Sequence, residues 1–283
     1  MTTDPSLQKA DFGAIYDQPD PRPYFTTLEP YDYVIPQHGA DVYAQLLKLL
    51  TTGAEQPPKV LDVCCSYGVV PMLLKTALDM RELYKHYGDP ATAALSTEEV
   101  AEVDRRLLLE HLQPGAPYVI GLDVAKNAVD YAVATGSLDA GATENLETDD
   151  PSGRLATLLS EVDLITTTGG VGYVTDLTFD RLLKAAPDSV WVAAFCLRTY
   201  DYGPIAEALG ARGLRTERAA RTFPQRRFTG PEEKRWAVSE ARSRGYDPAD
   251  KEAGGYYHAG FYLSRPAEEV SRRPLEQLLP GLC

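Results

Sequence analysis

Small and acidic side chains follow the first strongly apolar segment of the chain, in the sequence VLDVCCSYG from Val60 to Gly68. Asp62 ends the apolar run, and Cys64 and Ser66 stand at alternate positions before the glycine. A strand that enters a tight loop and then a helix leaves free N–H groups beside the loop, and these groups can bind a polar or anionic ligand. We therefore expect a ligand-binding loop here.

The adjacent Cys64 and Cys65 raise the alternative of a metal or redox site. The other two cysteines, Cys196 and Cys283, do not stand at C-x-x-C spacing, and the four histidines are scattered without the spacing of a zinc helix. Vicinal cysteines also rarely reach disulfide geometry with each other. We expect no metal site and interpret the cysteines as small, reduced residues.

A second acid, Asp123, ends the apolar run YVIGLD. A carboxylate at the end of a neighbouring parallel strand can hydrogen-bond the two hydroxyls of a ribose. Asp123 comes 55 residues after Gly68, whereas a plain strand–helix–strand unit places this acid about 20 residues on. A helical insert at about residues 79–115 explains the excess, and Ser96 and Glu99 within it have the spacing of a capping box.

Strand and helix patterns alternate along most of the chain. Long apolar runs at residues 162–170 and 189–198 are typical of parallel strands buried on both faces. Two further strand patterns, LRTERAARTF and YYHAGFYLSR, lie near the end. This alternation predicts an α/β protein with a doubly wound open sheet, whose ligand site lies at the carboxyl ends of the strands.

At these residues the sequence resembles the class I S-adenosylmethionine-dependent methyltransferases, whose first motif is an acid followed by a glycine-rich turn. DVCCSYG matches that motif with Asp62 as the acid and Gly68 as the last glycine, and Cys64 and Ser66 replace the two earlier glycines. The resemblance covers about residues 60–265. It implies a Rossmann-like, seven-stranded methyltransferase sheet whose last strand, YYHAGFYLSR, is antiparallel.

The resemblance also implies that S-adenosylmethionine is the cofactor. Its candidate contacts are Asp62, Cys64, Ser66, Gly68, Asp123, Glu147, Thr168 and Gly169. Glu147 takes the place of an acid that lies by the adenine, with Asp149 as the alternative. Because cysteine and serine disfavour positive φ, we expect the loop to stay in ordinary φ space. The Ser66 hydroxyl would then bond the amino or carboxylate end of the cofactor, or else cap the next helix.

The reacting groups are harder to assign, because methyl transfer depends mainly on positioning. The segment TTGGVGYV lacks the Asn/Asp-Pro-Pro-Tyr signature, so methylation of DNA bases or amide nitrogens loses support. Tyr173 and Tyr33 are the catalytic candidates, since a tyrosine can face a sulfonium and orient a nucleophile. Alternatively, Tyr173 packs on the sheet. Tyr24, Arg198 and Arg227 are the candidate substrate contacts, the arginines as carboxylate anchors.

The first forty residues are rich in proline and tyrosine. Prolines forbid a long helix, so we expect an extended strap that covers an apolar face, a ligand, or both. The predicted division is a strap and helix at 1–52 and a cofactor-binding domain at 53–283.

Three functions remain open on the sequence. The first is a methyltransferase acting on a small molecule. The second, as in methyltransferase-like enzymes, is cyclisation of the cofactor to azetidine-2-carboxylate and methylthioadenosine. The third is a non-catalytic cofactor-binding regulator. NAD binding is less favoured because G-x-G-x-x-G is absent.

The charge balance bears on partners. With 28 basic and 41 acidic side chains the net charge is −13, which disfavours nucleic acid and anionic membranes. Apolar runs fall short of the roughly 20 residues that span a bilayer, and the first residues lack signal-peptide features. We expect a cytoplasmic protein whose partner is a small molecule.

Overall fold

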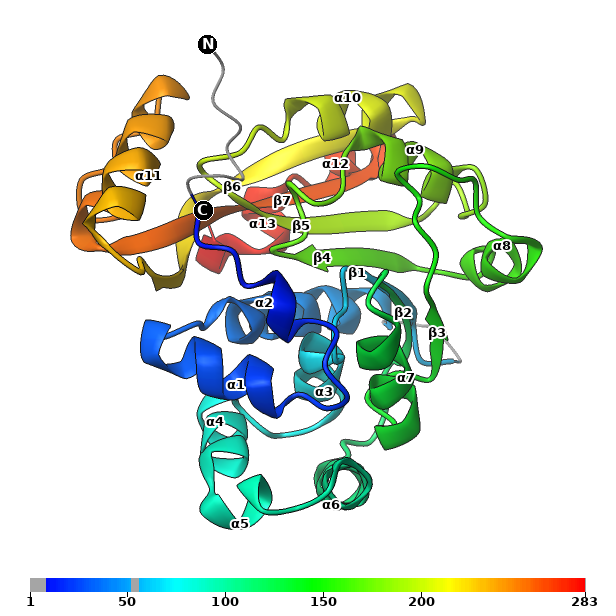
Figure 1. Ribbon diagram of the computed structural model, residues 1–283. Helices are drawn as coiled ribbons and strands as arrows, with labels where there is room; N and C mark the ends of the chain where they lie inside the picture. The colour runs from blue at the N-terminus through cyan, green and yellow to red at the C-terminus, as the bar shows by residue number, and fades with distance from the viewer. Residues whose placement is uncertain (1–8, 52–55, 283) are drawn as a thin grey trace.

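The computed structural model describes residues 9–51 and 56–282, so expectations about residues 1–8 and Cys283 lie outside it. A single sheet forms the centre, and helices cover both of its faces (Figure 1). The strands are β1 Lys59–Val63, β2 Tyr118–Leu122, β3 Ala140–Ala142, β4 Leu164–Thr168, β5 Trp191–Leu197, β6 Leu214–Arg227 and β7 Tyr256–Pro266. The helices are α1 Arg22–Leu28, α2 Ile35–Leu50, α3 Val69–Lys75, α4 Met80–Gly88, α5 Pro90–Ala93, α6 Thr97–His111, α7 Lys126–Thr135, α8 Gly153–Leu159, α9 Asp176–Leu183, α10 Gly203–Ala211, α11 Pro231–Ser243, α12 Ala267–Arg272 and α13 Leu275–Leu278.

The seven strands lie in the order β3-β2-β1-β4-β5-β7-β6. Strands β1 to β5 are parallel, and β7 is antiparallel to both β5 and β6. This order with an antiparallel β7 is the class I methyltransferase fold, which confirms the expected fold class. The chain builds outward from β1 to β3 and then returns to β4, so the switch in strand order lies between β1 and β4.

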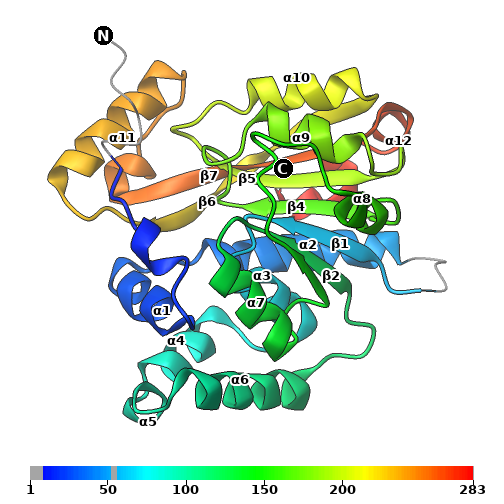
Figure 2. The same ribbon diagram turned by 45° about the vertical axis from the view of Figure 1, so that its right-hand side comes forward.

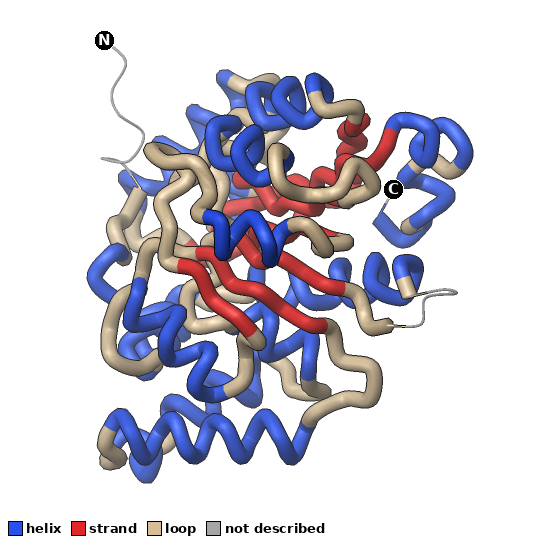
Figure 3. Tube along the Cα trace, turned by 90° about the vertical axis from the view of Figure 1, so that its right-hand side faces the viewer, coloured by secondary structure: helices blue, strands red, loops and turns tan. Residues whose placement is uncertain are grey.

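Side chains alternate between two apolar cores, one on each face of the sheet. In β1, Val60 belongs to one core and Leu61 and Val63 belong to the other. Helices α2, α3 and α7 cover the first face, and α8, α9 and α10 cover the second (Figures 2 and 3). The apolar runs of the sequence are therefore strands buried on both faces, as expected.

The helical insert is confirmed and consists of α4, α5 and α6. A capping box at Ser96 and Glu99 begins α6, as its spacing predicts. The insert leaves and rejoins the sheet layer at one point, where Thr76 and Leu112 form an antiparallel bridge. The buried Asp104 of α6 accepts hydrogen bonds from Tyr87 of α4 (2.6 Å) and from Tyr131 of α7 (2.5 Å) and so ties the insert to the body.

The segment before α2 is not the extended strap that the prolines suggested. It folds into short turns and α1, which carries a proline in its first turn, where the missing N–H removes no helical bond. Phe25 of α1 stacks on Tyr87 of the insert with ring centroids 4.2 Å apart. Among the described residues, no helix is long and apolar enough to cross a membrane.

Candidate active site

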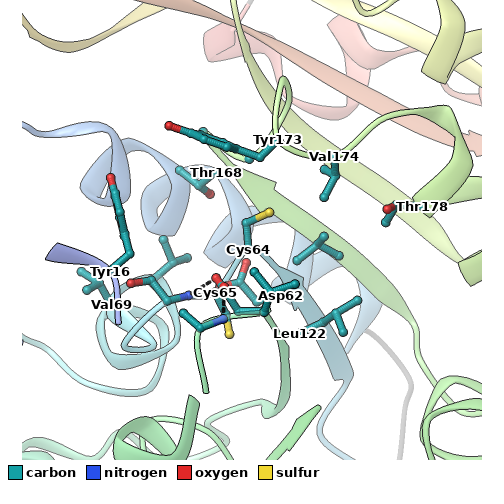
Figure 4. A pocket seen from close by; sticks show the side chains of 18 of the residues that line it. Tyr16, Asp62, Cys64, Cys65, Val69, Leu122, Thr168, Tyr173, Val174 and Thr178 are labelled. Atoms are coloured by element: carbon teal, nitrogen blue, oxygen red, sulfur yellow. Dashed lines mark hydrogen bonds between the residues drawn. The ribbon is translucent and has the colours of Figure 1, made fainter. Parts of the chain in front are cut away.

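A pocket of about 540 Å³ opens at the switch in strand order (Figure 4). Its floor and walls come from the loops that follow β1, β2, β3 and β4, and its remaining side comes from the segment before α2. The volume is within the range of roughly 300–1,000 Å³ that is common for small-molecule sites. The residues that the sequence singled out after β1 and β2 are thereby brought together.

The loop after β1 has a left-handed conformation at three alternate positions. The φ angles are 59° at Cys64, 48° at Ser66 and 67° at Gly68, so the expectation of ordinary φ space was wrong. The turn is fixed by backbone bonds, because the N–H groups of Cys64 and Cys65 both donate to the Leu122 carbonyl (2.8 and 3.4 Å). These bonds help to offset the roughly 1–2 kcal/mol that each of the two side chains costs in this conformation.

Asp123 holds the same loop from the neighbouring strand. One of its carboxylate oxygens accepts the Ser66 N–H at 2.8 Å, and the other accepts the Ala125 N–H at 3.0 Å. Burial raises the pKa of Asp123, and these N–H bonds act in the opposite direction. Each oxygen retains a lone pair, so the carboxylate can still accept from ligand hydroxyls.

Ser66 is one of the residues that line the pocket, and its hydroxyl oxygen is buried without a hydrogen-bond partner among the described residues. Helix α3 begins at an N-cap Gly68 with no side-chain cap bond, so Ser66 does not cap it. A buried hydroxyl without a partner carries a desolvation cost of about 1–3 kcal/mol. A polar ligand atom in the pocket would remove that cost.

The paired cysteines point in opposite directions (Figure 4). Cys65 is buried against β2, where a side chain at Gly121 would meet its sulfur at 2.7 Å. Cys64 lines the pocket. Burial raises the pKa of both thiols, so they stay protonated and poorly reactive. The described cysteines are free, and no metal-ligating cluster occurs among the described residues.

Asp62 lies under the pocket and accepts a hydrogen bond from the Thr166 hydroxyl at 2.8 Å. Burial raises its pKa to about 7, against the effect of that bond, and the Asp123 charge adds to the rise. A cationic group in the pocket would favour the ionised form of Asp62.

Glu147 lines the pocket and also accepts hydrogen bonds from other residues of the protein. Its two oxygens accept hydrogen bonds from the Thr175 N–H and hydroxyl (both 2.8 Å) and the Thr178 hydroxyl (2.6 Å), which ties the loop after β3 to the start of α9. The alternative acid, Asp149, is not among the lining residues, whereas Glu144 and Asn145 are.

Tyrosines form the side of the pocket opposite Glu147. Tyr16, Tyr24 and Tyr33 pack edge to face, with centroids 5.8 and 6.1 Å apart, and the hydroxyls of Tyr24 and Tyr33 are hydrogen-bonded. Tyr173 stands on the loop after β4 and is 67% exposed, so it is not packed on the sheet. Figure 4 shows Tyr173 above Cys64 and Tyr16 to the left of it.

Thr168 and Gly169 line the pocket at the end of β4, where the Thr168 hydroxyl is 2.9 Å from that of Tyr43. Three other predicted site residues do not line it. Gly68 faces the core, where a side chain would meet Ser137 at 3.0 Å.

The predicted carboxylate anchors lie elsewhere. Arg198 forms a buried ion pair with Glu252 at 3.2 Å, and the exposed Arg227 donates to the Tyr256 hydroxyl at 2.8 Å. Both arginines therefore interact with other residues of the protein, as buried and surface arginines commonly do.

Several lining residues were not anticipated as site residues: Asp17, Val124, Glu144 and Asn145. The position of Val124, directly after Asp123, could have indicated it. Glu144 and Asn145 could have been found in the same way, had the short strand before them been recognised.

Comparisons with known proteins bear on the fold alone. No family model and no curated protein matches the sequence. Similar solved structures include a TehB-like SAM-dependent methyltransferase from Corynebacterium glutamicum (14% identity, 77% of this chain and 86% of that chain, TM-score 0.38). The plantazolicin methyltransferase BpumL in complex with SAH is 10% identical, and the match covers 89% of this chain and 88% of that chain with a TM-score of 0.39. Geranyl diphosphate C-methyltransferase from Streptomyces coelicolor is also 10% identical, and the match covers 80% of this chain and 79% of that chain with a TM-score of 0.39. Because these similarities are distant, the assignment of the fold rests on the strand order.

Proposed function

We propose that the protein is an S-adenosylmethionine-dependent methyltransferase that acts on a small molecule. The observation that carries this proposal is a pocket at the switch in strand order that is lined by Asp123 and by Ser66, whose buried hydroxyl has no hydrogen-bond partner among the described residues. A buried hydroxyl without a partner lowers stability, and a contact with a bound ligand would offset that cost.

The lining residues fit the proposed cofactor. Asp123 would accept the ribose hydroxyls, and Val124, which is 65% exposed in the free protein, would pack against the adenine. Ser66 would bond the amino or carboxylate end. The cofactor supplies an electrophilic methyl group on a sulfonium, and carboxylates around the pocket favour such a cation.

The lining also limits the second substrate. Five carboxylates line the pocket, and no lysine or arginine is among its lining residues in the described chain: the acids are Asp17, Asp62, Asp123, Glu144 and Glu147. An anionic substrate would meet like charges and no cationic side chain among these lining residues. We therefore expect the acceptor to be neutral or cationic.

The cyclase is the second candidate, and the tyrosines at one side of the pocket favour it. Tyr16, Tyr24 and Tyr33 line that side, and the insert supports them, since the Tyr84 hydroxyl donates to the Tyr33 carbonyl at 2.7 Å. A cofactor that filled the space beside these rings would leave no room for a second substrate, which would suit a reaction within the cofactor.

One experiment separates the candidates. The purified protein is incubated with S-adenosylmethionine alone, and the products are followed by chromatography. Turnover only after an acceptor amine or hydroxyl compound is added supports the methyltransferase, whereas methylthioadenosine without an acceptor supports the cyclase. Tight binding by calorimetry without turnover under any condition would indicate the regulator. Absence of binding would contradict all three.

A further inference from the structure

Three tyrosine rings surround one ammonium group next to the pocket. The Lys9 Nζ lies 5.8 Å from the ring centroids of Tyr173 and Tyr200 and 5.9 Å from that of Tyr257. The rings come from the loop after β4, the loop after β5 and the start of β7, so the fold assembles them from separate parts of the chain. We call these three tyrosines the tyrosine cage.

Contacts within the fold hold two of the three members of the cage in place. Gly172 has a φ of 108° and lies so close to the Tyr200 ring that a side chain there would meet it at 2.9 Å. The buried Tyr257 donates its hydroxyl to Glu233 at 3.2 Å and packs on Phe228. Tyr173 also lines the pocket, so the cage and the pocket are adjacent.

Lys9 contacts this cage only weakly. All three distances are near the limit of about 6 Å for a cation–π contact, so the lysine ammonium gains little from the ring faces. Burial and the Arg226 charge lower the pKa of Lys9 to about 8, although Glu233 opposes this. A methylated ammonium is larger and would bring its methyl groups closer to the ring faces, and a quaternary one cannot lose its charge.

We propose that the tyrosine cage is a binding site for a methylated ammonium group and that Lys9 occupies it when no ligand is present. Aromatic cages recognise such groups because the ring faces attract a cation that water holds only weakly. The assignment of this ammonium group to the second substrate rests on the proposed function. The existence of the binding site does not rest on it.

The test compares choline with 3,3-dimethylbutan-1-ol, which has the same shape and no charge. Binding of each is measured by calorimetry or ligand-observed NMR without cofactor, in the unchanged protein and in Lys9→Met. We expect choline but not the neutral alcohol to bind, and Lys9→Met to tighten choline binding several-fold because a competing group is removed. Lys126→Met, at an exposed lysine paired with Asp130, is the matched control and should leave affinity unchanged.

Variants of Tyr200 locate the site. Tyr200→Phe keeps the ring and should keep choline binding, whereas Tyr200→Leu should weaken it at least several-fold, with folding of both checked by circular dichroism. Equal binding of the two probes, no choline binding to Lys9→Met, or unchanged binding by Tyr200→Leu would overturn the proposal. No cofactor is present in these measurements, so their failure is distinct from a failure of the proposed function.

Discussion

Cys64 and Ser66 adopt a backbone conformation that glycine would reach with less strain, and both retain a side chain that lines the pocket. Strain of this kind persists where the side chain has a use. The two residues therefore allow stability and ligand binding to be separated by experiment.

Ser66→Gly should stabilise the protein by about 1 kcal/mol, because the left-handed conformation is released from strain and a buried unpartnered hydroxyl is removed. It should also weaken S-adenosylmethionine binding several-fold. Thermal unfolding and calorimetry measure the two effects. Cys64→Gly relieves the same kind of strain without removing a hydroxyl, so it is the comparison for the change in stability. Loss of stability in Ser66→Gly would show that the hydroxyl has a structural role instead.

Asp62 should make stability depend on pH. Its pKa rises from an ordinary value of 3.8 to about 7 on folding, so the folded state binds the proton more tightly than the unfolded state. The contribution of Asp62 to the free energy of unfolding is therefore most favourable below about pH 4, and this contribution is lost as the pH rises from about 4 to 7. In Asp62→Asn this loss, on the order of 2–4 kcal/mol, should be absent. Urea unfolding at pH 4, 5.5 and 8 measures it; parallel pH profiles for the two proteins would contradict the assignment.

At the scale of elements, Glu147 connects the loop after β3 to α9 through three hydrogen bonds. Glu147→Ala should destabilise the protein by about 1–3 kcal/mol, because the Thr175 and Thr178 donors lose their acceptor. Glu147→Gln keeps the shape and separates the roles: if Glu147 also contacts the adenine, cofactor affinity falls more than stability does. Unfolding and calorimetry on both variants decide between these roles.

The insert depends on Asp104, whose carboxylate joins α4, α6 and α7. Asp104→Ala should lower the free energy of unfolding by about 3–5 kcal/mol, because His86, Tyr87 and Tyr131 lose a buried hydrogen-bond partner. The exposed pair of Lys126 and Asp130 provides a control, since Asp130→Ala should change stability by less than about 1 kcal/mol. Similar losses in the two variants, measured by denaturant unfolding, would argue against the role of Asp104.

Much of this arrangement was predictable from the sequence, and the failures have physical causes. The apolar runs were sufficient to predict a doubly wound sheet with its ligand site at the carboxyl ends of the strands, and the resemblance around the acids at 62 and 123 added the antiparallel last strand. β3 was missed because it has only three residues, Ala140–Ala142, and no apolar run. The left-handed loop was missed because tertiary hydrogen bonds to Leu122 and Asp123, not local preference, fix its conformation.

The anchoring arginines were misplaced for a related reason. The sequence does not show whether an arginine binds a substrate or another residue of the protein. In the structure, Arg198 forms an ion pair with Glu252. The prolines suggested that the segment before α2 is extended. A proline is compatible with a helix when it stands in the first turn, as it does in α1. Contacts with the insert, which no local pattern reveals, determine its fold.

For the whole molecule, a net charge of −13 predicts weak interaction with polyanions. We expect no binding to duplex DNA, RNA or anionic lipid vesicles at about 0.15 M salt, measured by fluorescence anisotropy and vesicle sedimentation. Micromolar affinity for any of them would contradict this. A cationic ligand should instead bind more tightly as salt is reduced, because the carboxylates that surround the pocket are then less screened.

The single bridge between Thr76 and Leu112 has a consequence for engineering. Since the chain departs and returns at neighbouring positions, helices α4 to α6 form a cassette that a short turn could replace without shifting the register of β1 and β2. Such a protein would keep the loop after β1 but lose the support behind the tyrosines of the segment before α2. A wider entrance would follow, and with it a scaffold open to bulkier substrates.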